Sequence, residues 1–292
     1  MTGPVRIVRP RAAILIPAYN EAAVIGRTLA CLGKDMHPGE FEVIVVANGC
    51  TDSTAAQARQ AMPEACVLET STPGKCNALR LGLAHVSAPA VVFLDADLDI
   101  DAASIRRLIA PLLSGSALAS HGRMIVDLAG CDTLVRAFYA IWSRSAYLRG
   151  GKFGGAFALS ARALPRIQPL PDLIADDEFI SRSFLPAEKC FVRDVAFTAR
   201  APRTLRDLVK IRKRSLRGTR ELNALGCVPP DQCGRHGRVK LVIDAALTPR
   251  LWPALSVFLS VMAAVRLGLA VDSKNRGQTW ERDDSSRVAQ PQ

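Results

Sequence analysis

The chain has 292 residues, of which 49% are hydrophobic and 22% are charged. This composition is typical of a folded globular protein and excludes a disordered or fibrous chain. The formal net charge is +11, and residues 201–292, with 17 basic and 8 acidic residues, contribute +9 of it. Such a basic C-terminal third indicates a phosphate-rich partner or an anionic membrane surface. Nucleic acid is not expected, because no DNA-binding or RNA-stacking pattern accompanies the charge.

The first third of the chain alternates short apolar runs with segments of helical periodicity. Strands are predicted at 12–17, 41–46, 66–69 and 90–94, and helices at 21–32, 51–62 and 75–86. Short apolar runs of this kind are typical of strands that are buried on both faces. The alternation therefore predicts an α/β fold with a mainly parallel sheet flanked by helices.

The rest of the chain is less regular. Strands are predicted near 117–126 and at 157–159 and 191–199, and helices near 133–149 and at 176–184 and 205–225. The last of these helices is long and basic. A glycine-rich stretch at 150–155 does not follow a strand into a helix, so it is not a dinucleotide-binding loop.

An apolar segment at residues 251–271 follows the basic region. Its first 15 residues carry no charge, but Arg266 then interrupts it, and a membrane span needs about 20 apolar residues. We therefore expect an interfacial or re-entrant helix with Trp252 near the lipid headgroups, or else a helix that covers the domain. The predicted organisation is a main domain at 1–202, a basic helical region at 203–250, the apolar helix at 251–271 and a polar tail at 272–292.

Four acidic residues, Asp95, Asp97, Asp99 and Asp101, alternate directly after the fourth predicted strand. The carboxyl ends of parallel strands form the usual ligand edge of such a sheet. Where the strand opens into a loop, two carboxylates can converge on one hard divalent cation. The alternative is a helix N-terminus, where acids complement the dipole; it explains Asp99 and Asp101 but not Asp95 and Asp97.

Six short motifs follow one another between residues 12 and 220. They are Ile14-Leu-Ile-Pro17-Ala-Tyr19-Asn-Glu21, Val45-Val-Ala-Asn48-Gly-Cys-Thr-Asp52, Gly74-Lys75-Cys-Asn77, Phe93-Leu-Asp95-Ala-Asp97, Ala175-Asp176-Asp177-Glu178 and Arg212-Lys-Arg214-Ser-Leu-Arg217. In this order they resemble the family 2 glycosyltransferases. The resemblance implies a GT-A fold, here with a basic and partly apolar C-terminal helical extension.

The resemblance also implies roles for individual residues. The residues of a nucleotide pocket would be Pro17, Ala18, Tyr19, Glu21, Asn48, Lys75 and Asp95. Asp97 would hold Mg²⁺ or Mn²⁺ on the diphosphate. Asp177, with Asp176 beside it, would be the general base that deprotonates the acceptor hydroxyl; the alternative for this acidic group is again a helix N-terminus.

Two further groups would contact the acceptor or the diphosphate. Arg212, Arg214 and Arg217 match phosphate oxygens in their geometry, although some basic residues of this helix must simply face solvent. Gly154 and Gly155 would form a loop on the acceptor side, where glycine lets the backbone approach a sugar closely.

The chain departs from the family pattern at two positions. Ala47-Asn48 stands where Asp-Asp or Asp-Asn is usual, so one carboxylate that could contact the base is absent. Ser215 replaces a tryptophan that in some relatives accompanies processive polymer synthesis, which favours a non-processive enzyme.

The resulting hypothesis is a metal-dependent inverting glycosyltransferase. It would move a sugar from a nucleoside-diphosphate sugar to a hydroxyl of a lipid-linked or polysaccharide-precursor acceptor. The eight cysteines show no CxxC pair or disulfide spacing, which favours a reducing cytoplasm, with the protein peripheral on the inner face of the cell membrane. The alternatives are a sugar transferase to polyprenyl phosphate, whose nucleophile needs no general base, and a non-catalytic partner that binds nucleotide sugars.

Overall fold

The computed structural model describes residues 9–145, 148–149, 153–227 and 235–272. The chain divides into two compact units. Unit 1 comprises Met1–Gly122, Gly155–Asp172 and Pro186–Ala196, and unit 2 comprises Arg123–Gly154, Leu173–Leu185 and Phe197–Gln292. Neither unit is one continuous stretch of sequence, and the functional division expected at residues 202, 250 and 271 remains a prediction.

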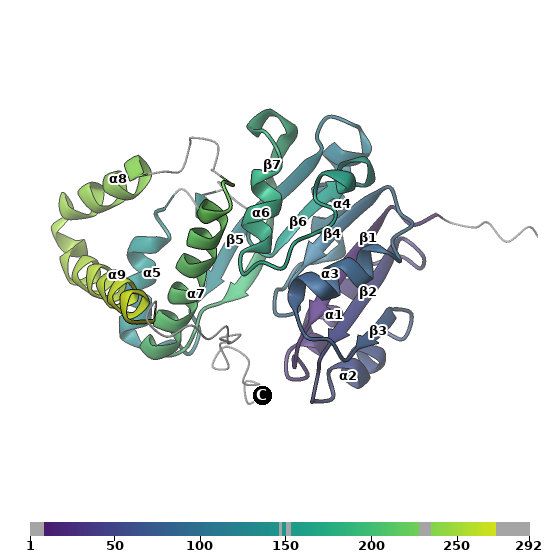
Figure 1. Ribbon diagram of the computed structural model, residues 1–292, viewed down its shortest axis with the longest axis horizontal. Coiled ribbons are helices and arrows are strands. Elements are labelled where there is room, and N and C mark those ends of the chain that lie inside the picture. Colours follow the sequence, from purple (N-terminus) through teal and green to yellow (C-terminus); the bar gives the residue numbers. More distant parts are fainter. Residues whose placement is uncertain (1–8, 146–147, 150–152, 228–234, 273–292) are drawn as a thin grey trace, which may run out of the picture. The chain divides into compact units, whose positions relative to one another are not determined.

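Unit 1 contains the alternating strands and helices that the sequence predicts, and one further helix after the fourth strand that was not predicted. Its strands include β1 (Ala12–Ala18), β2 (Phe41–Asn48), β3 (Cys66–Thr70) and β4 (Ala90–Leu94). Its helices are α1 (Ile25–Gly33), α2 (Thr54–Ala61), α3 (Lys75–Leu83) and α4 (Ala102–Leu113). These four strands pair in parallel in the order β3-β2-β1-β4 (Figure 1), so the parallel sheet is confirmed for this part of the chain.

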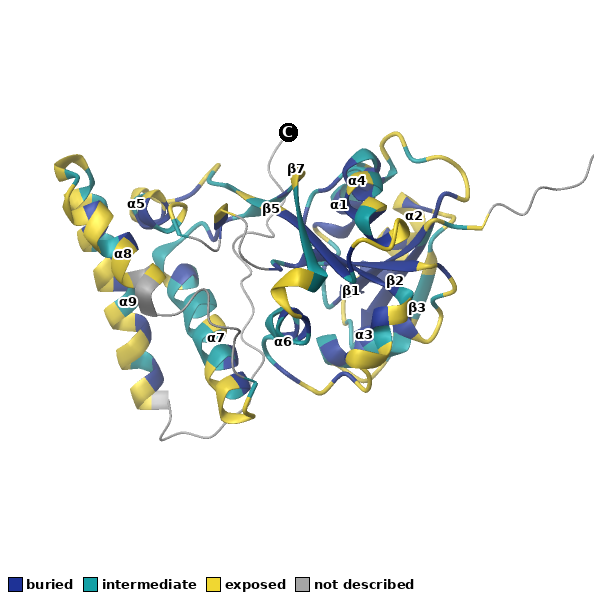
Figure 2. Ribbon diagram, turned by 90° about the horizontal axis from the view of Figure 1, so that it is seen from above, coloured by how far each residue is buried: buried dark blue, intermediate teal, exposed yellow. Residues whose placement is uncertain are grey.

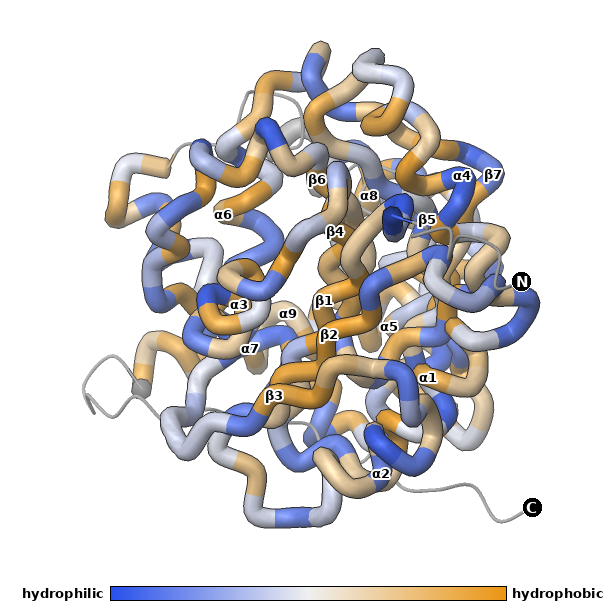
Figure 3. The backbone as a smooth tube through the Cα atoms, turned by 90° about the vertical axis from the view of Figure 1, so that its right-hand side faces the viewer, coloured by the Kyte–Doolittle hydropathy of each residue, from blue (hydrophilic) through white to orange (hydrophobic). Residues whose placement is uncertain are grey.

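The helices α1 and α2 start three or four residues later than predicted, because the residues before them form hydrogen-bonded loops. Helices cover both faces of the sheet, with α1 and α4 on one side and α3 on the other (Figure 2). Helix α3 approaches closely because Gly82 has no side chain: a Cβ there would lie 2.1 Å from Leu15 Cδ1. Every residue of β1 is buried, and the parallel strands are coloured as hydrophobic in Figure 3.

The second half of the sheet differs from the expected parallel arrangement. The strands β5 (Ala119–Asp127), β6 (Ala156–Ser160) and β7 (Lys189–Arg200) extend the order to β3-β2-β1-β4-β6-β5-β7. Strand β6 is antiparallel to both β4 and β5. Apolar runs of similar length are compatible with either direction, so the sequence pattern could not distinguish them.

Unit 2 is mainly helical. Its helices include α5 (Thr133–Trp142), α6 (Asp176–Arg182), α7 (Leu205–Ala224), α8 (Arg235–Ala246) and α9 (Trp252–Asp272). Short 3₁₀ helices lie at Ala161–Arg166 and Pro186–Glu188 in unit 1 and at Pro249–Leu251 in unit 2. The core of unit 2 joins α5 to α9, where the Phe138 and Phe258 rings stack with centroids 5.2 Å apart.

One helical prediction in unit 2 needs correction, and another gains its bounds. The helix predicted near 133–149 ends at Trp142, and the Ser143 amide closes a turn on the Tyr139 carbonyl. Helix α8 lies in the predicted basic helical region at 203–250, where no bounds were predicted for it. It buries Leu241 and Ala245 in the core of unit 2, while Val239 and Ile243 face solvent.

The C-terminal apolar segment at 251–271 is confirmed as a helix. Pro249–Val271 is long and apolar enough to cross a membrane by length and composition. The polar tail, from residue 273 on, lies outside the described residues.

Candidate active site

The loops that follow β1 and β2 are joined by hydrogen bonds at the carboxyl edge of the sheet. The amide of Glu21 donates to Thr54 Oγ1 at 2.7 Å, and the amide of Ala22 donates to Asp52 Oδ2 at 3.1 Å. Asn20 adopts a left-handed backbone with φ 52° and accepts the Thr51 amide at 2.7 Å. This junction fixes the segment in which four predicted nucleotide-pocket residues lie: Pro17, Ala18, Tyr19 and Glu21.

Asn48, another predicted pocket residue, is 2% exposed. Its Nδ2 donates to the Ala18 carbonyl at 2.8 Å, and its Oδ1 accepts the Gly74 amide at 3.0 Å. The side chain therefore holds the end of β1 to the residue that precedes Lys75. An amide suits this place because it both donates and accepts, which a carboxylate cannot do.

Lys75 and Asp95, which the resemblance assigns to the donor site, lie together. Lys75 is the first residue of α3, and its Nζ is 2.7 Å from Asp95 Oδ1. The Lys75 side chain is 18% exposed and the Asp95 side chain 36% exposed. The pair places a cation and an anion at the end of β4, where each can exchange its partner for a bound ligand.

The turn after Asp95 is held by helix α1. Thr28 Oγ1 donates to the Ala96 carbonyl at 2.8 Å, and Arg27 donates to the Asp97 carbonyl at 3.2 Å and to Asp99 Oδ1 at 2.9 Å. Both α1 residues therefore fix the backbone that carries Asp97, the predicted metal ligand.

The alternative of a helix N-terminus is correct for Asp101 and not for Asp99. Asp101 caps α4 and accepts the Ser104 amide at 2.7 Å, and its hydrogen bonds with Ser104 lower the pKa of the Asp101 carboxyl. Asp99 instead forms the ion pair with Arg27. No group of three or more metal-ligating side chains occurs among the described residues. A metal at Asp97 would thus depend on diphosphate and water oxygens for further ligands, as Mg²⁺ commonly does.

Gly155, a predicted acceptor residue, packs on Asp95. Its carbonyl accepts the Asp95 amide at 2.8 Å, and its φ of 81° lies in the left-handed region. A Cβ at this position would stand 2.5 Å from Asp95 Oδ2. Glycine is therefore needed next to the donor motif. Gly154 precedes it and is half-buried in unit 2, and residues 150–152 of the glycine-rich stretch lie outside the described residues.

In unit 2, the acidic group Asp176, Asp177 and Glu178 forms the first turn of α6. Asp176 is 5% exposed, whereas Asp177 is half-buried and accepts the Glu178 amide at 2.7 Å. Glu178 is ion-paired with Arg182 at 2.8 Å. The third carboxylate of the group is thus neutralised within its own helix, and the Asp177 carboxylate is held at the start of α6.

Helix α7 holds this acidic turn in place. Glu221 accepts the Ile174 amide at 3.0 Å, and Arg182 donates to Asn223 at 3.0 Å. Close approach is possible because α7 has glycine at position 218, where a Cβ would lie 2.8 Å from Ala175 Cβ.

The structure divides the three predicted phosphate-binding arginines of α7. The Arg212 guanidinium lies 4.7 Å from the centroid of the Trp142 ring, a cation–π contact within the packing of α5 on α7. Arg214 and Arg217 are half-buried. Arg214 lies one turn before Gly218, on the face of α7 that meets Ala175, whereas Arg217 directly precedes Gly218. The contact of Arg214 and Arg217 with the acceptor or the diphosphate remains a prediction.

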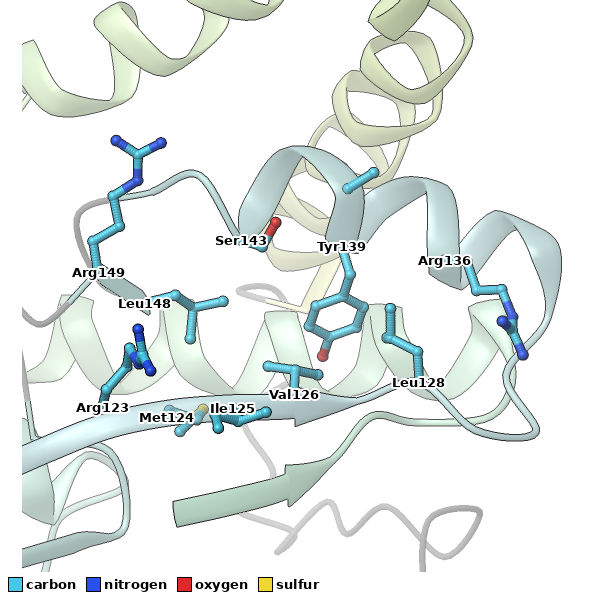
Figure 4. Close-up of a pocket in the computed structure, with 11 residues that line it drawn as sticks. Arg123, Met124, Ile125, Val126, Leu128, Arg136, Tyr139, Ser143, Leu148 and Arg149 are labelled. Atoms are coloured by element: carbon cyan, nitrogen blue, oxygen red, sulfur yellow. The ribbon is translucent and has the colours of Figure 1, made fainter. Parts of the chain in front are cut away.

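A pocket of about 490 Å³ opens in unit 2 beside α5. Figure 4 shows Tyr139 reaching from α5 toward Val126 and Leu128. Three arginines line the same pocket, namely Arg123, Arg136 and Arg149, and within the described part of the chain none of them forms an ion pair. All three are exposed, and Arg136 Nε donates to the Cys131 carbonyl at 3.1 Å. An apolar lining with exposed guanidinium groups suits a ligand that is both apolar and anionic.

The residues that support these sites carry no signal in the sequence. Arg27, Thr28 and Thr54 act through contacts with segments 33 to 72 positions away in the chain. No spacing or periodicity indicates such a contact. The pocket arginines were equally unpredictable, because they lie on different elements and belong to no motif.

Residues 13–150 match the family model described as Glycosyl transferase family 2. An undecaprenyl-phosphate 4-deoxy-4-formamido-L-arabinose transferase of Enterobacter sp. (strain 638) is 34% identical over 112 residues, which cover 34% of this chain and 33% of that protein. A glucosyl-3-phosphoglycerate synthase of Mycobacterium tuberculosis is 33% identical over 116 residues, 36% of this chain and 35% of that protein. The chain thus spans about a third of the length of these two relatives.

Solved structures share the fold. A mannosyltransferase of Pyrobaculum calidifontis in complex with GDP-Man and Mn²⁺ has a TM-score of 0.58 at 21% identity, over 91% of this chain and 80% of that one. Glucosyl-3-phosphoglycerate synthase of Mycobacterium tuberculosis in complex with phosphoglyceric acid has a TM-score of 0.56 at 22% identity, over 76% and 82%. The six motifs lie in order on this sheet, residues 13–150 are similar to the family 2 glycosyltransferases, and the chain has the GT-A fold of the solved structures.

Proposed function

We propose that the chain is a metal-dependent inverting glycosyltransferase that uses a nucleoside-diphosphate sugar as donor and a lipid-linked or polysaccharide-precursor acceptor. The observation that carries this proposal is the Lys75–Asp95 pair at the end of β4, with Asp97 two residues further on. A cation, a carboxylate and a second carboxylate on a fixed turn are what a diphosphate and its divalent ion require.

On the donor side, Lys75 would turn from Asp95 to the diphosphate when the donor binds. Asp95 is then available for the ribose hydroxyls or for water around the ion. Asp97 would hold Mg²⁺ or Mn²⁺, which when bound neutralises charge that develops on the departing nucleoside diphosphate. Mn²⁺ in the complex of the Pyrobaculum calidifontis mannosyltransferase supports a divalent ion.

On the acceptor side, Asp177 would accept the proton of the attacking hydroxyl, with inversion at the anomeric carbon. Its half-buried carboxylate stands on a turn that is anchored by Glu221 and Arg182. General-base catalysis of this kind contributes about 10²–10⁴-fold to the rate. Arg214 and Arg217 would bind phosphate of the acceptor or of the leaving group.

The pocket beside α5 supports a lipid-linked acceptor. Its apolar lining suits a hydrocarbon chain, and Arg123, Arg136 and Arg149 suit phosphate. It equally favours a second candidate function, sugar transfer to polyprenyl phosphate itself. The name of the Enterobacter relative, an undecaprenyl-phosphate transferase, points in the same direction.

The two functions differ in the nucleophile. A phosphate oxygen is already anionic and needs no base, whereas a hydroxyl must lose its proton. In a transfer assay with a radiolabelled nucleotide sugar, Asp177→Asn should lose at least about a hundredfold in rate if the acceptor is a hydroxyl, and little if it is a phosphate. Asp172→Asn, an exposed carboxylate paired with Arg80, is the matched control.

The donor site is tested by thermal unfolding with UDP, GDP, dTDP and CMP, each with Mn²⁺ and with a chelator. A ligand at about 100 times its Kd stabilises the protein by about 2.7 kcal/mol. We expect a metal-dependent rise in Tm with one nucleoside diphosphate that Asp97→Ala abolishes. Equal shifts with and without metal would remove the metal role. A shift without any transfer to lipid or saccharide acceptors would favour the non-catalytic binding partner.

The proposed place of action is the cytoplasmic face of the cell membrane. The +9 net charge of residues 201–292 and the apolar helix α9 support association with an anionic bilayer. A lipid-linked acceptor would be presented at that surface.

A further inference from the structure

Helices α8 and α9 carry apolar surface that the described part of the chain leaves uncovered. We define it as the outer apolar face, and it consists of Val239, Ile243 and Leu247 at α8 and Trp252, Leu259, Leu267 and Val271 on α9. All seven side chains are between 46% and 78% exposed. Figure 2 shows exposed residues in yellow along both helices. An apolar surface of this extent on a folded protein indicates a partner that buries it.

Helix α9 is apolar on all sides, but only one side packs on protein that the structure describes. Leu255, Phe258, Val261, Val265 and Leu269 are buried in the core of unit 2. In its most apolar 18-residue window, 28% of the residues are buried. A helix that is apolar all round needs an apolar environment all round, so the outer apolar face calls for lipid or for another chain.

Length alone would let α9 cross a bilayer, since 21 residues of helix measure about 31 Å. Its packing argues against a crossing. The buried residues from Leu255 to Leu269 run along about 21 Å of the helix, and over this length α9 lies on α5 and α7. If α9 crossed the bilayer, either α5 and α7 would enter the hydrocarbon with it, or α9 would have to separate from them.

Neither course is compatible with the neighbouring helices. Helix α7 carries seven basic residues, which are costly in hydrocarbon. One of them is seated on α9 itself: a Cβ at Gly268 would lie 3.1 Å from Lys213 Nζ. If α9 left instead, the buried α5 residues Val135, Phe138 and Ile141 would face water.

Charge decides between lipid and a second copy of the chain. Three exposed basic residues lie on or between α8 and α9, namely Lys240, Arg250 and Arg266. Among the described side chains of the two helices, one acidic residue is exposed, Asp244. Copies that carry like charges at the edge of an apolar contact repel each other, whereas an anionic bilayer attracts them. Trp252, whose Nε1 donates to the Ala246 carbonyl at 2.9 Å, stands at the corner between the helices, where the ring suits the headgroup level.

We infer that α8 and α9 lie flat on an anionic membrane surface, with the outer apolar face sunk between the headgroups and α9 not crossing the bilayer. This inference rests on the proposed membrane association and specifies its mode. It orients unit 2, because the side of α9 that packs on α5 and α7 must face away from the lipid.

The test is flotation of the full-length protein with vesicles of phosphatidylcholine, alone or with phosphatidylglycerol added. We expect stronger binding to the vesicles with phosphatidylglycerol, and complete release by alkaline carbonate, which removes surface-bound proteins but not membrane-spanning ones. Leu259→Ser with Leu267→Ser should weaken binding about tenfold for each substitution. Arg250→Gln and Arg266→Gln should each weaken binding to the anionic vesicles about fivefold.

A matched control is Leu185→Ser with Leu225→Ser. These leucines are 65% and 61% exposed but lie outside α8 and α9, so this variant should float like the wild type. Thermal unfolding with the nucleoside diphosphate and Mn²⁺ shows whether each variant is folded and keeps its donor site, independently of lipid.

Three results would overturn the inference. Wild-type protein that floats but resists carbonate would mean that α9 crosses the bilayer, while membrane association itself would stand. Absence of flotation would overturn both the inference and the proposed membrane association. The donor site would still be tested separately by thermal unfolding with nucleotides. A dimer in light scattering that Leu259→Ser with Leu267→Ser dissociates would mean that a second copy covers the face.

Discussion

Replacing Gly155 with alanine should lower both the stability of the protein and its affinity for the donor nucleotide, because the new side chain displaces Asp95. The backbone at this residue has φ 81°, which costs an L-residue about 1–2 kcal/mol. The new Cβ would also stand 2.5 Å from Asp95 Oδ2. The carboxylate can relieve this clash only by turning away, and it then loses its ion pair with Lys75, which at this exposure contributes up to about 1 kcal/mol.

The expected total is a loss of about 2–3 kcal/mol in the free energy of unfolding, or roughly 4–10 °C in Tm. The affinity for the nucleoside diphosphate with Mn²⁺, measured by calorimetric titration, should fall about tenfold, because Asp95 is displaced.

Gly115→Ala is the matched control for backbone strain. Gly115 has φ 78°, and a Cβ at this position would meet only the flexible end of the Arg162 side chain, at 3.5 Å. It should therefore lose about 1–2 kcal/mol of stability and no donor affinity. If Gly155→Ala binds the nucleoside diphosphate as tightly as Gly115→Ala does, the proposed dependence of the donor site on the Gly155–Asp95 contact is refuted.

Three further substitutions test other parts of the chain. Burial, with a smaller effect of Lys189, lowers the pKa of His121 to about 4. Below about pH 6.5 the unfolded chain therefore binds more protons than the folded chain, and the free energy of unfolding should fall by about 2 kcal/mol between about pH 7 and pH 5 in urea unfolding. His121→Gln should remove this loss, and the same dependence of stability on pH in that variant would contradict the prediction. Asn48→Ala leaves the Ala18 carbonyl and the Gly74 amide unsatisfied in a buried place and should lower the free energy of urea unfolding by about 2–3 kcal/mol; a loss below about 0.5 kcal/mol would mean that water replaces the side chain. Gly218→Val should push Ala175 and the acidic turn away from α7. The rate of sugar transfer should then fall more than about tenfold, while the affinity for the nucleoside diphosphate is unchanged. The control is Gly237→Ala, at a glycine in open space, and equal transfer rates for the two variants would contradict this prediction.

The order of apolar runs and motifs along the chain was enough to predict the parallel half of the sheet and the place of the donor motifs. Strands that are buried on both faces require continuous apolar runs, and β1, β2 and β4 have them. Parallel strands that alternate with helices bring their carboxyl ends to one edge. The resemblance assigns Lys75 and Asp95, 20 positions apart in the sequence, to one site, and the two side chains lie 2.7 Å apart.

What each polar residue at that edge does depends on the neighbours that folding brings to it. Asp99 and Asp101 look alike in the sequence, yet one pairs with Arg27 and the other caps α4. Arg212 and Arg214 lie two residues apart on α7, and a helix turns by about 200° over that interval, which sends Arg212 to the Trp142 ring. Spacing along the chain predicts which face of a helix a residue occupies, but not which neighbour the fold brings to that face.

The direction of β6, the end of α5 and the bounds of α8 were also settled only by packing. Apolar runs of similar length fit either strand direction, so the antiparallel pairing of β6 with β4 had no local signal. Helix α8 turns Val239 and Ile243 outward, against the usual rule that apolar residues mark the buried side. The apolar periodicity of a helix predicts its buried side only when that side packs on protein. Here the outer apolar face has no protein partner within the described chain.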